Sequence, residues 1–293
     1  MAEVRFIART SIDRINQEGA KKISGMKSSS PIGIYDSGVG GLTVLKEAFH
    51  QLPNENIIYL ADTARVPYGG RSPAEIIKIN HEIIKFLVKQ KVKYIIMACG
   101  TSSALALESV KKSYKVPIIG MIKPGASSAL KVSRNKKIGV LATVGTASSH
   151  AFQKAINSED KKAKVFEVGC PLFVPLIEGG FIDSEETKKV IKNYTAPLIE
   201  KDIDTIILGC THYPHLSQAI QEVIGLKIKL VDPAVAVIKE AKNEMAKLNL
   251  LADKRQKPSY TYYTTSQPLQ FQEVGSRLLG KQIGSVKNVR IKS

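Results

Sequence analysis

The sequence of 293 residues contains no tryptophan and only three cysteines, Cys99, Cys170 and Cys210. The cysteines are odd in number, widely spaced and include no C-x-x-C pair, which argues against a disulfide framework and against a zinc knuckle. We therefore expect three free thiols in a reducing compartment.

Long apolar runs are absent as well. The stretch from Tyr94 to Cys99 is typical and ends after six residues, whereas a membrane-spanning helix needs about 20. The first 22 residues mix Arg, Asp and Glu and show neither the apolar block nor the small-residue cleavage site of a secretory signal. We expect a cytoplasmic protein that makes no contact with a membrane.

Acidic residues are scarce relative to basic ones: 26 Asp and Glu against 43 Lys and Arg give a formal net charge of +17. Such an excess can indicate nucleic-acid binding, because basic side chains gain affinity by releasing phosphate counterions. Here the lysines form short, scattered pairs such as Lys111-Lys112, without interleaved aromatics and without a zinc-finger or RNP pattern. We expect a solvated basic surface that attracts small anions. Nucleic acid is the weaker alternative, which a salt titration against duplex DNA would separate.

The sequence does contain a regular alternation of short β-rich runs with helical patterns. Apolar residues make up 43% of the chain and charged residues 24%, as in ordinary globular proteins. The alternation predicts parallel sheets covered by helices on both faces. The β-rich runs span residues 32–35, 56–61, 93–98, 116–120, 137–142, 164–169, 204–209 and 227–232. One helix start is well marked, because Ser72-Pro73-Ala74-Glu75 combines a capping box with proline at the first helical position.

The chain also resembles itself. Segments that begin at Ile32, Lys93 and Val116 are similar to segments that begin 106, 111 and 112 residues later. Nearly constant offsets indicate two copies of one α/β unit. We predict two pseudo-symmetric, doubly wound α/β domains with the active site in the cleft between them. The predicted parts are a flexible N-terminal extension over 1–30, a first domain over 31–122 plus 232–293, and a second domain over 123–231.

Two of the cysteines follow equivalent strands of this repeat. Cys99 comes after YIIMA and Cys210 after TIILG, and ligands of open parallel sheets bind just beyond the carboxyl ends of the strands. A lone cysteine there would be read as a small buried hydrophobe. Two of them, opposed across a cleft, suit a two-base racemase, in which one base removes the α-proton and a conjugate acid protonates the other face. Cysteine can fill both roles, because its ordinary pKa of about 8.5 is easily tuned.

Polar residues beside the cysteines fit the same chemistry. Asp36 opens a DSGVGG turn, whose glycines let main-chain N–H groups approach an anion, although the spacing is neither that of a dinucleotide loop nor that of a Walker loop. His212 lies two residues after Cys210, where it can act on the thiol or on a substrate carboxylate. His212 and His215 form an H-x-x-H pair without an acidic ligand set. We expect neither a metal nor a cofactor.

Five segments carry a family resemblance. DSGVGGLTVL, ADTARVPYG, ACGTSS, GCPLFVPLIEGG and GCTHYP, in this order and spacing, resemble the glutamate racemase signatures of bacterial cell-wall synthesis from about Ile32 to the C-terminus. The resemblance implies a pyridoxal-independent isomerase that interconverts L- and D-glutamate and supplies D-glutamate for peptidoglycan, and hence for cell-wall biogenesis and cell shape. GCTHYP and GCPLFVPLIE favour this family over the related aspartate racemases, whose activity is one alternative.

The resemblance also implies roles for individual residues. Cys99 and Cys210 would be the acid/base pair, with Cys99 acting on the D-isomer and Cys210 on the L-isomer, and Cys170 would be structural. The residues implied to assist the proton transfers are Asp36, Glu178 and His212. Without the resemblance, Glu178 would be read as a surface carboxylate before a Gly-Gly turn. The residues implied to hold the substrate are Asp36, Ser37, Pro67, Tyr68, Gly69, Gly100, Thr101, Thr211 and His212.

One residue departs from the pattern. Similar enzymes read A-C-N-T where this chain reads Ala98-Cys99-Gly100-Thr101, so that a side-chain amide is missing. We expect a weakened racemase that Gly100→Asn would speed up by about tenfold, the worth of one hydrogen bond to a charged group. A homologue that acts as a binding or regulatory protein is the second hypothesis. Besides small-molecule glutamate, the resemblance admits a homodimer and a cell-wall precursor as activator.

Overall fold

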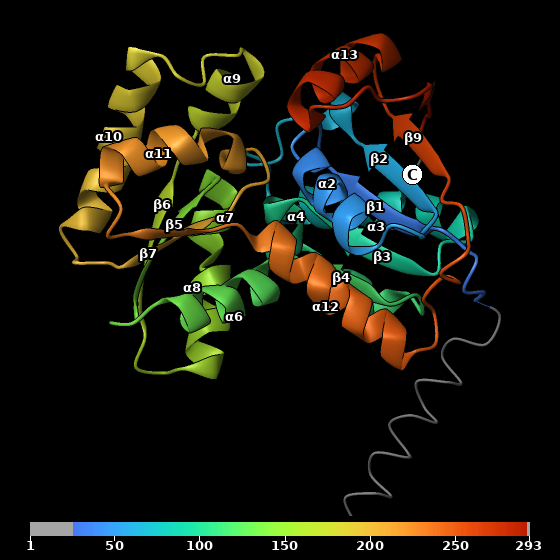
Figure 1. Ribbon diagram of the computed structural model, residues 1–293, viewed down its shortest axis with the longest axis horizontal. Helices are drawn as coiled ribbons and strands as arrows, with labels where there is room; N and C mark the ends of the chain where they lie inside the picture. The colour runs from blue at the N-terminus through green and yellow to red at the C-terminus, as the bar shows by residue number, and fades with distance from the viewer. Residues whose placement is uncertain (1–25, 292–293) are drawn as a thin grey trace, which may run out of the picture.

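The computed structural model describes residues 26–291, which form two α/β domains side by side (Figure 1). Both sheets are parallel throughout. The first sheet has the order β10-β9-β2-β1-β3-β4 and consists of β1 (Ile32–Asp36), β2 (Ile57–Ala61), β3 (Tyr94–Met97), β4 (Ile118–Gly120), β9 (Tyr260–Thr264) and β10 (Val286–Asn288). The second has the order β6-β5-β7-β8 and consists of β5 (Lys137–Ala142), β6 (Lys164–Gly169), β7 (Thr205–Leu208) and β8 (Lys229–Val231).

The two sheets share one topology. The order β2-β1-β3-β4 in the first domain is repeated as β6-β5-β7-β8 in the second. The sequence similarities pair β1 with β5, β3 with β7 and β4 with β8, as this repeat requires. The prediction of two pseudo-symmetric α/β domains is thus confirmed, and each of the eight predicted strands is present.

Helices cover both faces of each sheet, because the strands are apolar on both sides. All five residues of β1 and all four of β3 are buried. In the first domain the helices are α2 (Leu42–Gln51), α3 (Pro73–Lys89), α4 (Gly100–Leu105), α5 (Leu107–Ser113), α12 (Pro233–Lys247) and α13 (Pro268–Leu279). In the second they are α6 (Ile122–Val132), α7 (Val144–Ser149), α8 (Ala151–Glu159), α9 (Phe173–Glu178), α10 (Glu185–Ile199) and α11 (Ser217–Ile224). Four apolar cores result, one on each face of each sheet.

The predicted start of α3 is confirmed in detail. The Ser72 hydroxyl accepts the N–H of Glu75 at 3.3 Å, and Glu75 Oε2 accepts the N–H of Ser72 at 3.0 Å. Pro73 occupies the first helical position, where a missing N–H costs nothing. This cap fixes the end of the loop over residues 62–71, which reaches the second domain.

The chain crosses between the domains in α6 and α12. These helices pack closely against each other, since a Cβ on Gly125 would lie only 3.0 Å from Pro233 Cγ. Strands from 32–120 and from 260–288 therefore share the first sheet, and those from 137–231 form the second.

Most of the predicted N-terminal extension over 1–30 lies outside the described residues. Residues 26–30 are the part of it that the structure describes. The buried ammonium of Lys93 donates to the carbonyl of Ser28 and to the carboxylate of Glu55. Asn56 Nδ2 donates to the carbonyl of Ser29 at 3.0 Å. Residues 26–30 are thus bound to the first domain.

Residues 26–291 contain neither a membrane-spanning helix nor a cluster of metal ligands. None of the helices in this range combines the length and the apolar character that crossing a membrane requires. No three His, Cys, Asp or Glu side chains in the same range gather closely enough to bind a metal ion.

Candidate active site

The carboxyl ends of β1 and β3 face those of β5 and β7 at a contact that we call the seam, defined by three hydrogen bonds between the domains. The Thr211 hydroxyl donates to Asp36 Oδ2 at 3.2 Å. The Gly145 N–H donates to the carbonyl of Gly69 at 2.9 Å. The hydroxyls of Thr101 and Thr143 lie 2.9 Å apart. The predicted site residues meet along this seam.

Cys99 lies between β3 and the first turn of α4 and is 6% exposed. Burial raises the pKa of its thiol to about 12, and the negative charges of Asp36 and Cys210 add to the rise, whereas the N–H and hydroxyl of Ser102 oppose it. The thiol donates to Ser37 Oγ at 3.9 Å. Cys99 is therefore a protonated thiol at neutral pH.

Cys210 follows β7 and has a cationic neighbour. Its Sγ lies 3.9 Å from His212 Nδ1, and His212 Nε2 lies 2.9 Å from Glu178 Oε1. Burial alone would lower the pKa of His212, but the hydrogen bonds to Cys210 and Glu178, together with the charges of Cys210 and Asp36, raise it to about 10. His212 is therefore an imidazolium at neutral pH, and its positive charge lies beside the sulfur of Cys210.

Asp36 connects the surroundings of the two cysteines. Its side chain is fully buried, and burial raises the pKa of the carboxyl. The charge of His212 opposes this rise in pKa, as do hydrogen bonds from the Gly38 N–H, at 2.9 Å, and from the Thr211 hydroxyl. The effect of burial is the larger one, so that the pKa stays raised. A buried carboxylate with these donors can accept a further hydrogen bond from a cationic ligand group.

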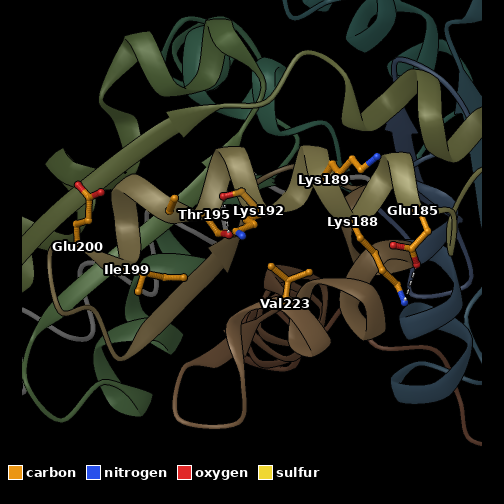
Figure 2. Close-up of a pocket in the computed structure, with 9 residues that line it drawn as sticks. Glu185, Lys188, Lys189, Lys192, Thr195, Ile199, Glu200 and Val223 are labelled. Carbon is orange, nitrogen blue, oxygen red and sulfur yellow. Dashed lines mark hydrogen bonds and ion pairs between the residues drawn. The ribbon is translucent and has the colours of Figure 1, made fainter.

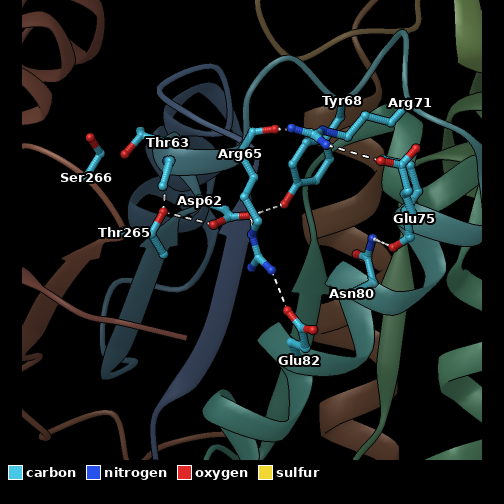
Figure 3. Close-up of polar contacts among 12 residues, drawn as sticks. Asp62, Thr63, Arg65, Tyr68, Arg71, Glu75, Asn80, Glu82, Thr265 and Ser266 are labelled. Carbon is cyan, nitrogen blue, oxygen red and sulfur yellow. Dashed lines mark hydrogen bonds and ion pairs between the residues drawn. The ribbon is translucent and has the colours of Figure 1, made fainter. Parts of the chain in front are cut away.

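The loop over residues 62–71 places Gly69 at the seam. Figure 3 shows the polar contacts of Tyr68 within the same loop. The buried hydroxyl of Tyr68 donates to the carboxylate of Asp62, which also accepts Arg65 Nε at 2.7 Å and the Thr265 hydroxyl at 2.9 Å. Pro67, one residue earlier, is exposed. Sequence reasoning missed Asp62 and Arg65, although both lie in the ADTARVPYG segment that drew attention to Tyr68.

Sequence reasoning also missed Ser102, in the first turn of α4. Its hydroxyl is buried and has no hydrogen-bond partner, a costly state that calls for an explanation. The same hydroxyl lowers the pKa of Cys99, which places it beside that sulfur. No pattern in the sequence distinguishes Ser102 from the neighbouring Ser103, whose hydroxyl donates to the carbonyl of Met97.

The other predicted residues fall into two groups. Ser37, Thr101, Thr211 and Gly100 lie at the seam, and Glu178 lies at its edge with a side chain that is 46% exposed. Cys170 lies apart from them, in the core of the second domain, where its thiol donates to the carbonyl of Val168 at 3.5 Å.

The structure shows a close contact at Gly100 that bears on the expectation for this residue. A Cβ on this residue would lie far inside van der Waals contact with the carbonyl oxygen of Gly209, which belongs to the opposite domain. The glycine at position 100 therefore does more than remove a side-chain amide. It permits the close approach of the two strand ends that carry Cys99 and Cys210. The prediction that Gly100→Asn raises activity did not take this contact into account, and it stays a prediction.

A groove of about 590 Å³ lies elsewhere on the second domain, between α10 and α11 (Figure 2). Its lining includes Lys189 and Lys192, together with Lys188, whose ammonium pairs with Glu222 at 3.2 Å. It contains none of the cysteines or acid/base residues of the seam. The groove therefore does not bear on the chemistry of the two thiols.

Comparison with known proteins identifies the class. The Asp/Glu/Hydantoin racemase family matches residues 36–241, and the chain belongs to this family. Within it, the chain is 47% identical to a glutamate racemase from Trichodesmium erythraeum, over 85% of this chain and 91% of the relative.

Solved structures agree with this assignment. A glutamate racemase isoform from Bacillus anthracis is 38% identical and superimposes with a TM-score of 0.86, over 89% of this chain and 98% of the other. A glutamate racemase from Francisella tularensis, solved in complex with D-glutamate, is 37% identical with a TM-score of 0.85, over 90% and 98%.

Proposed function

We propose that this protein is a glutamate racemase that interconverts L- and D-glutamate with Cys99 and Cys210 as its two bases. The observation that carries the proposal is the repeat, which places one thiol at the same strand end of each domain and turns both toward one seam. The similarity to glutamate racemases over most of the chain supports glutamate as the substrate.

The surroundings of the thiols suggest which of them acts as base first. Beside the imidazolium of His212, Cys210 as a thiolate removes the α-proton of L-glutamate, and Cys99, whose thiol carries a proton, delivers it to the opposite face. The products are D-glutamate, a Cys210 thiol and a Cys99 thiolate, so that protons and charge balance. D-glutamate reacts by the same steps in reverse.

The substrate's charges fit the groups at the seam. The carboxylate of Asp36 suits an ammonium group, and the main-chain N–H groups of the turn after β1 suit a carboxylate, as do the hydroxyls of Thr101 and Thr211. Since hydrogen bonds hold the seam together, we infer that the domains separate to admit glutamate and close again around it.

The two thiols at one seam favour the enzyme over a binding protein. A homologue retained only for binding has no need of a thiol at the equivalent strand end of each domain. We further propose a cytoplasmic enzyme that supplies D-glutamate for peptidoglycan. A homodimer and activation by a cell-wall precursor stay predictions.

The test is incubation of the purified protein with D-glutamate in deuterium oxide, without added pyridoxal phosphate or metal. We expect loss of the α-proton signal by NMR together with loss of optical rotation. Cys99→Ala and Cys210→Ala should each abolish racemisation, read as loss of optical rotation, whereas Cys170→Ala should change it little. No exchange by the wild-type protein at high concentration would refute the proposal, and faster exchange of aspartate would change its substrate.

A further inference from the structure

The helix that carries Glu178 ends in a way that leaves one main-chain carbonyl open. At the end of α9 the Phe181 N–H donates to the carbonyl of Leu176 at 2.9 Å, and the Gly180 N–H donates to that of Ile177 at 3.0 Å. With Gly180 at φ +83, this is a Schellman motif, which glycine adopts without strain. The two bonds satisfy the carbonyls of Leu176 and Ile177 but not that of Glu178.

The missing donor comes from the other domain. Nη2 of Arg277, in the last turn of α13, donates to the carbonyl of Glu178 at 2.9 Å. Helix α13 is held on α2 through Gly275, where a Cβ would lie 3.0 Å from Leu42 Cδ1. Leu278, next to Arg277, packs against a core of each domain. The first domain thus caps a helix of the second, and a cation at a helix C-terminus also suits the helix dipole.

This cap acts on the partner of His212. Glu178 Oε1 lies 2.9 Å from His212 Nε2, although the Glu178 side chain is 46% exposed. An exposed carboxylate keeps such a position when its main chain is fixed. The other titratable groups that face His212 are Cys210, Asp36 and His215.

We propose that Arg277 is a positioning residue, which holds Glu178 against His212 and thereby sets the proton affinity of the imidazole beside Cys210 when the domains close. Arg277 touches no reacting atom and acts through Glu178. The proposal rests on the proposed racemase reaction for its effect on rate, but its effect on His212 can be measured without turnover.

The experiment compares Arg277→Ala and Arg277→Lys with the wild type. We expect Arg277→Ala to reduce kcat about three- to tenfold, as for loss of an ordinary solvent-exposed hydrogen bond, with a smaller change in KM. The NMR titration midpoint of His212 should move to lower pH, because its bond to Glu178 is less well held. Loss of a nearby positive charge alone would move the midpoint to higher pH, so that the sign separates positioning from direct electrostatics.

Further variants keep the test sharp. Arg277→Lys should recover part of both effects, and Arg277→Ala should change little once Glu178→Gln is present, since both act on one interaction. Arg255→Ala is the matched control, because this 92% exposed side chain bonds only to Asp253 among residues 26–291. An unchanged or higher His212 midpoint in Arg277→Ala, or additive effects with Glu178→Gln, would overturn the proposal. An inactive wild-type protein would instead refute the proposed function.

Discussion

Cys99 and Cys210 end equivalent strands, yet their surroundings differ in charge. Cys99 faces the carboxylate of Asp36, and burial raises the pKa of its thiol to about 12, whereas Cys210 faces the imidazolium of His212. In the proposed mechanism each thiol alternates between base and acid, so that the Cys99 thiolate must be stabilised when it forms. Ser102 supplies donors for that state, because its hydroxyl has no other partner.

Ser102→Ala should therefore make the Cys99 thiolate harder to form. Removing the hydroxyl removes one of the groups that lower the pKa of Cys99, so that at any pH below that pKa less thiolate is present. We expect alkylation of Cys99 at pH 9 to slow by at least about tenfold, the effect of one hydrogen bond to a charged sulfur. Peptide mapping by mass spectrometry measures the rate.

Ser103→Ala is the control for this variant. The Ser103 hydroxyl donates to the carbonyl of Met97 at 3.0 Å and accepts the Met121 N–H at 3.1 Å, so that its loss should lower stability without altering Cys99. Equal rates of Cys99 alkylation in Ser102→Ala and the wild type would contradict the assigned contact.

At Gly100 the structure predicts the opposite of what the sequence suggests. In the closed seam any side chain pushes against the carbonyl of Gly209, the residue after β7, so that the two domains must move apart. Gly100→Ala and Gly100→Asn should both lower kcat/KM for glutamate by at least about tenfold, because displaced thiols no longer flank the α-carbon. Steady-state kinetics in both directions checks this. A gain in Gly100→Asn would show that the seam adopts a wider arrangement during catalysis.

At the scale of elements, the sequence was informative where local pattern decides the structure. The eight predicted strands are buried apolar runs, and Ser72-Pro73-Ala74-Glu75 carries its own capping chemistry, so that both could be recognised. Strands β9 and β10 were missed, because β9 is a half-buried Tyr/Thr run at 260–264 and β10 has three residues, none fully buried. Their pairing depends on the rest of the sheet.

The candidate site divides in the same way. Cys99 and Cys210 could be found because the repeat places them at equivalent strand ends. Asp62, Ser102 and Arg277 could not, since each matters through a neighbour that only the fold brings near: the hydroxyl of Tyr68, the sulfur of Cys99 and the carbonyl of Glu178. The contact between Gly100 and Gly209 could not be predicted for the same reason.

The segment before β1 offers a test at this scale. A chain shortened to begin at Met26 keeps the Ser28 carbonyl that the buried Lys93 ammonium binds, whereas one that begins at Pro31 loses it. An unsatisfied buried donor costs about 1–3 kcal/mol, so the free energy of unfolding of the shorter chain, measured by urea unfolding, should be lower by that amount. The chain from Met26 should match the full chain. Equal stability of both shortened chains would show that Glu55 alone satisfies Lys93.

For the whole molecule, the seam is where packing and charge come together. Gly40 and Gly100 both lie too close to the second domain to carry a Cβ without a shift. A Cβ on Gly40 would clash with His212, and a Cβ on Gly100 would clash with Gly209. The domains therefore approach at main-chain distance, and water is kept from Cys99, Asp36 and His212, all of them less than 10% exposed. Exclusion of water is what allows these groups to shift each other's pKa values so far.

The shifts make stability fall as pH rises. The pKa of His212 is raised from 6.5 to about 10, and that of Cys99 from 9.0 to about 12, so that both groups hold protons more tightly in the folded state. The stabilisation from His212 is complete below pH 6.5 and is lost progressively between that pH and about 10, with that from Cys99 following between pH 9 and 12. Urea unfolding at pH 6.5, 8 and 9.5 should show the free energy of unfolding decreasing by up to about 1.4 kcal/mol per pH unit for each titrating group. In His212→Gln the free energy of unfolding should change less with pH between pH 7 and 9, whatever the stability of the variant at a single pH. A slope unchanged in His212→Gln would show that the imidazole does not hold its proton as the contacts with Cys210 and Glu178 require.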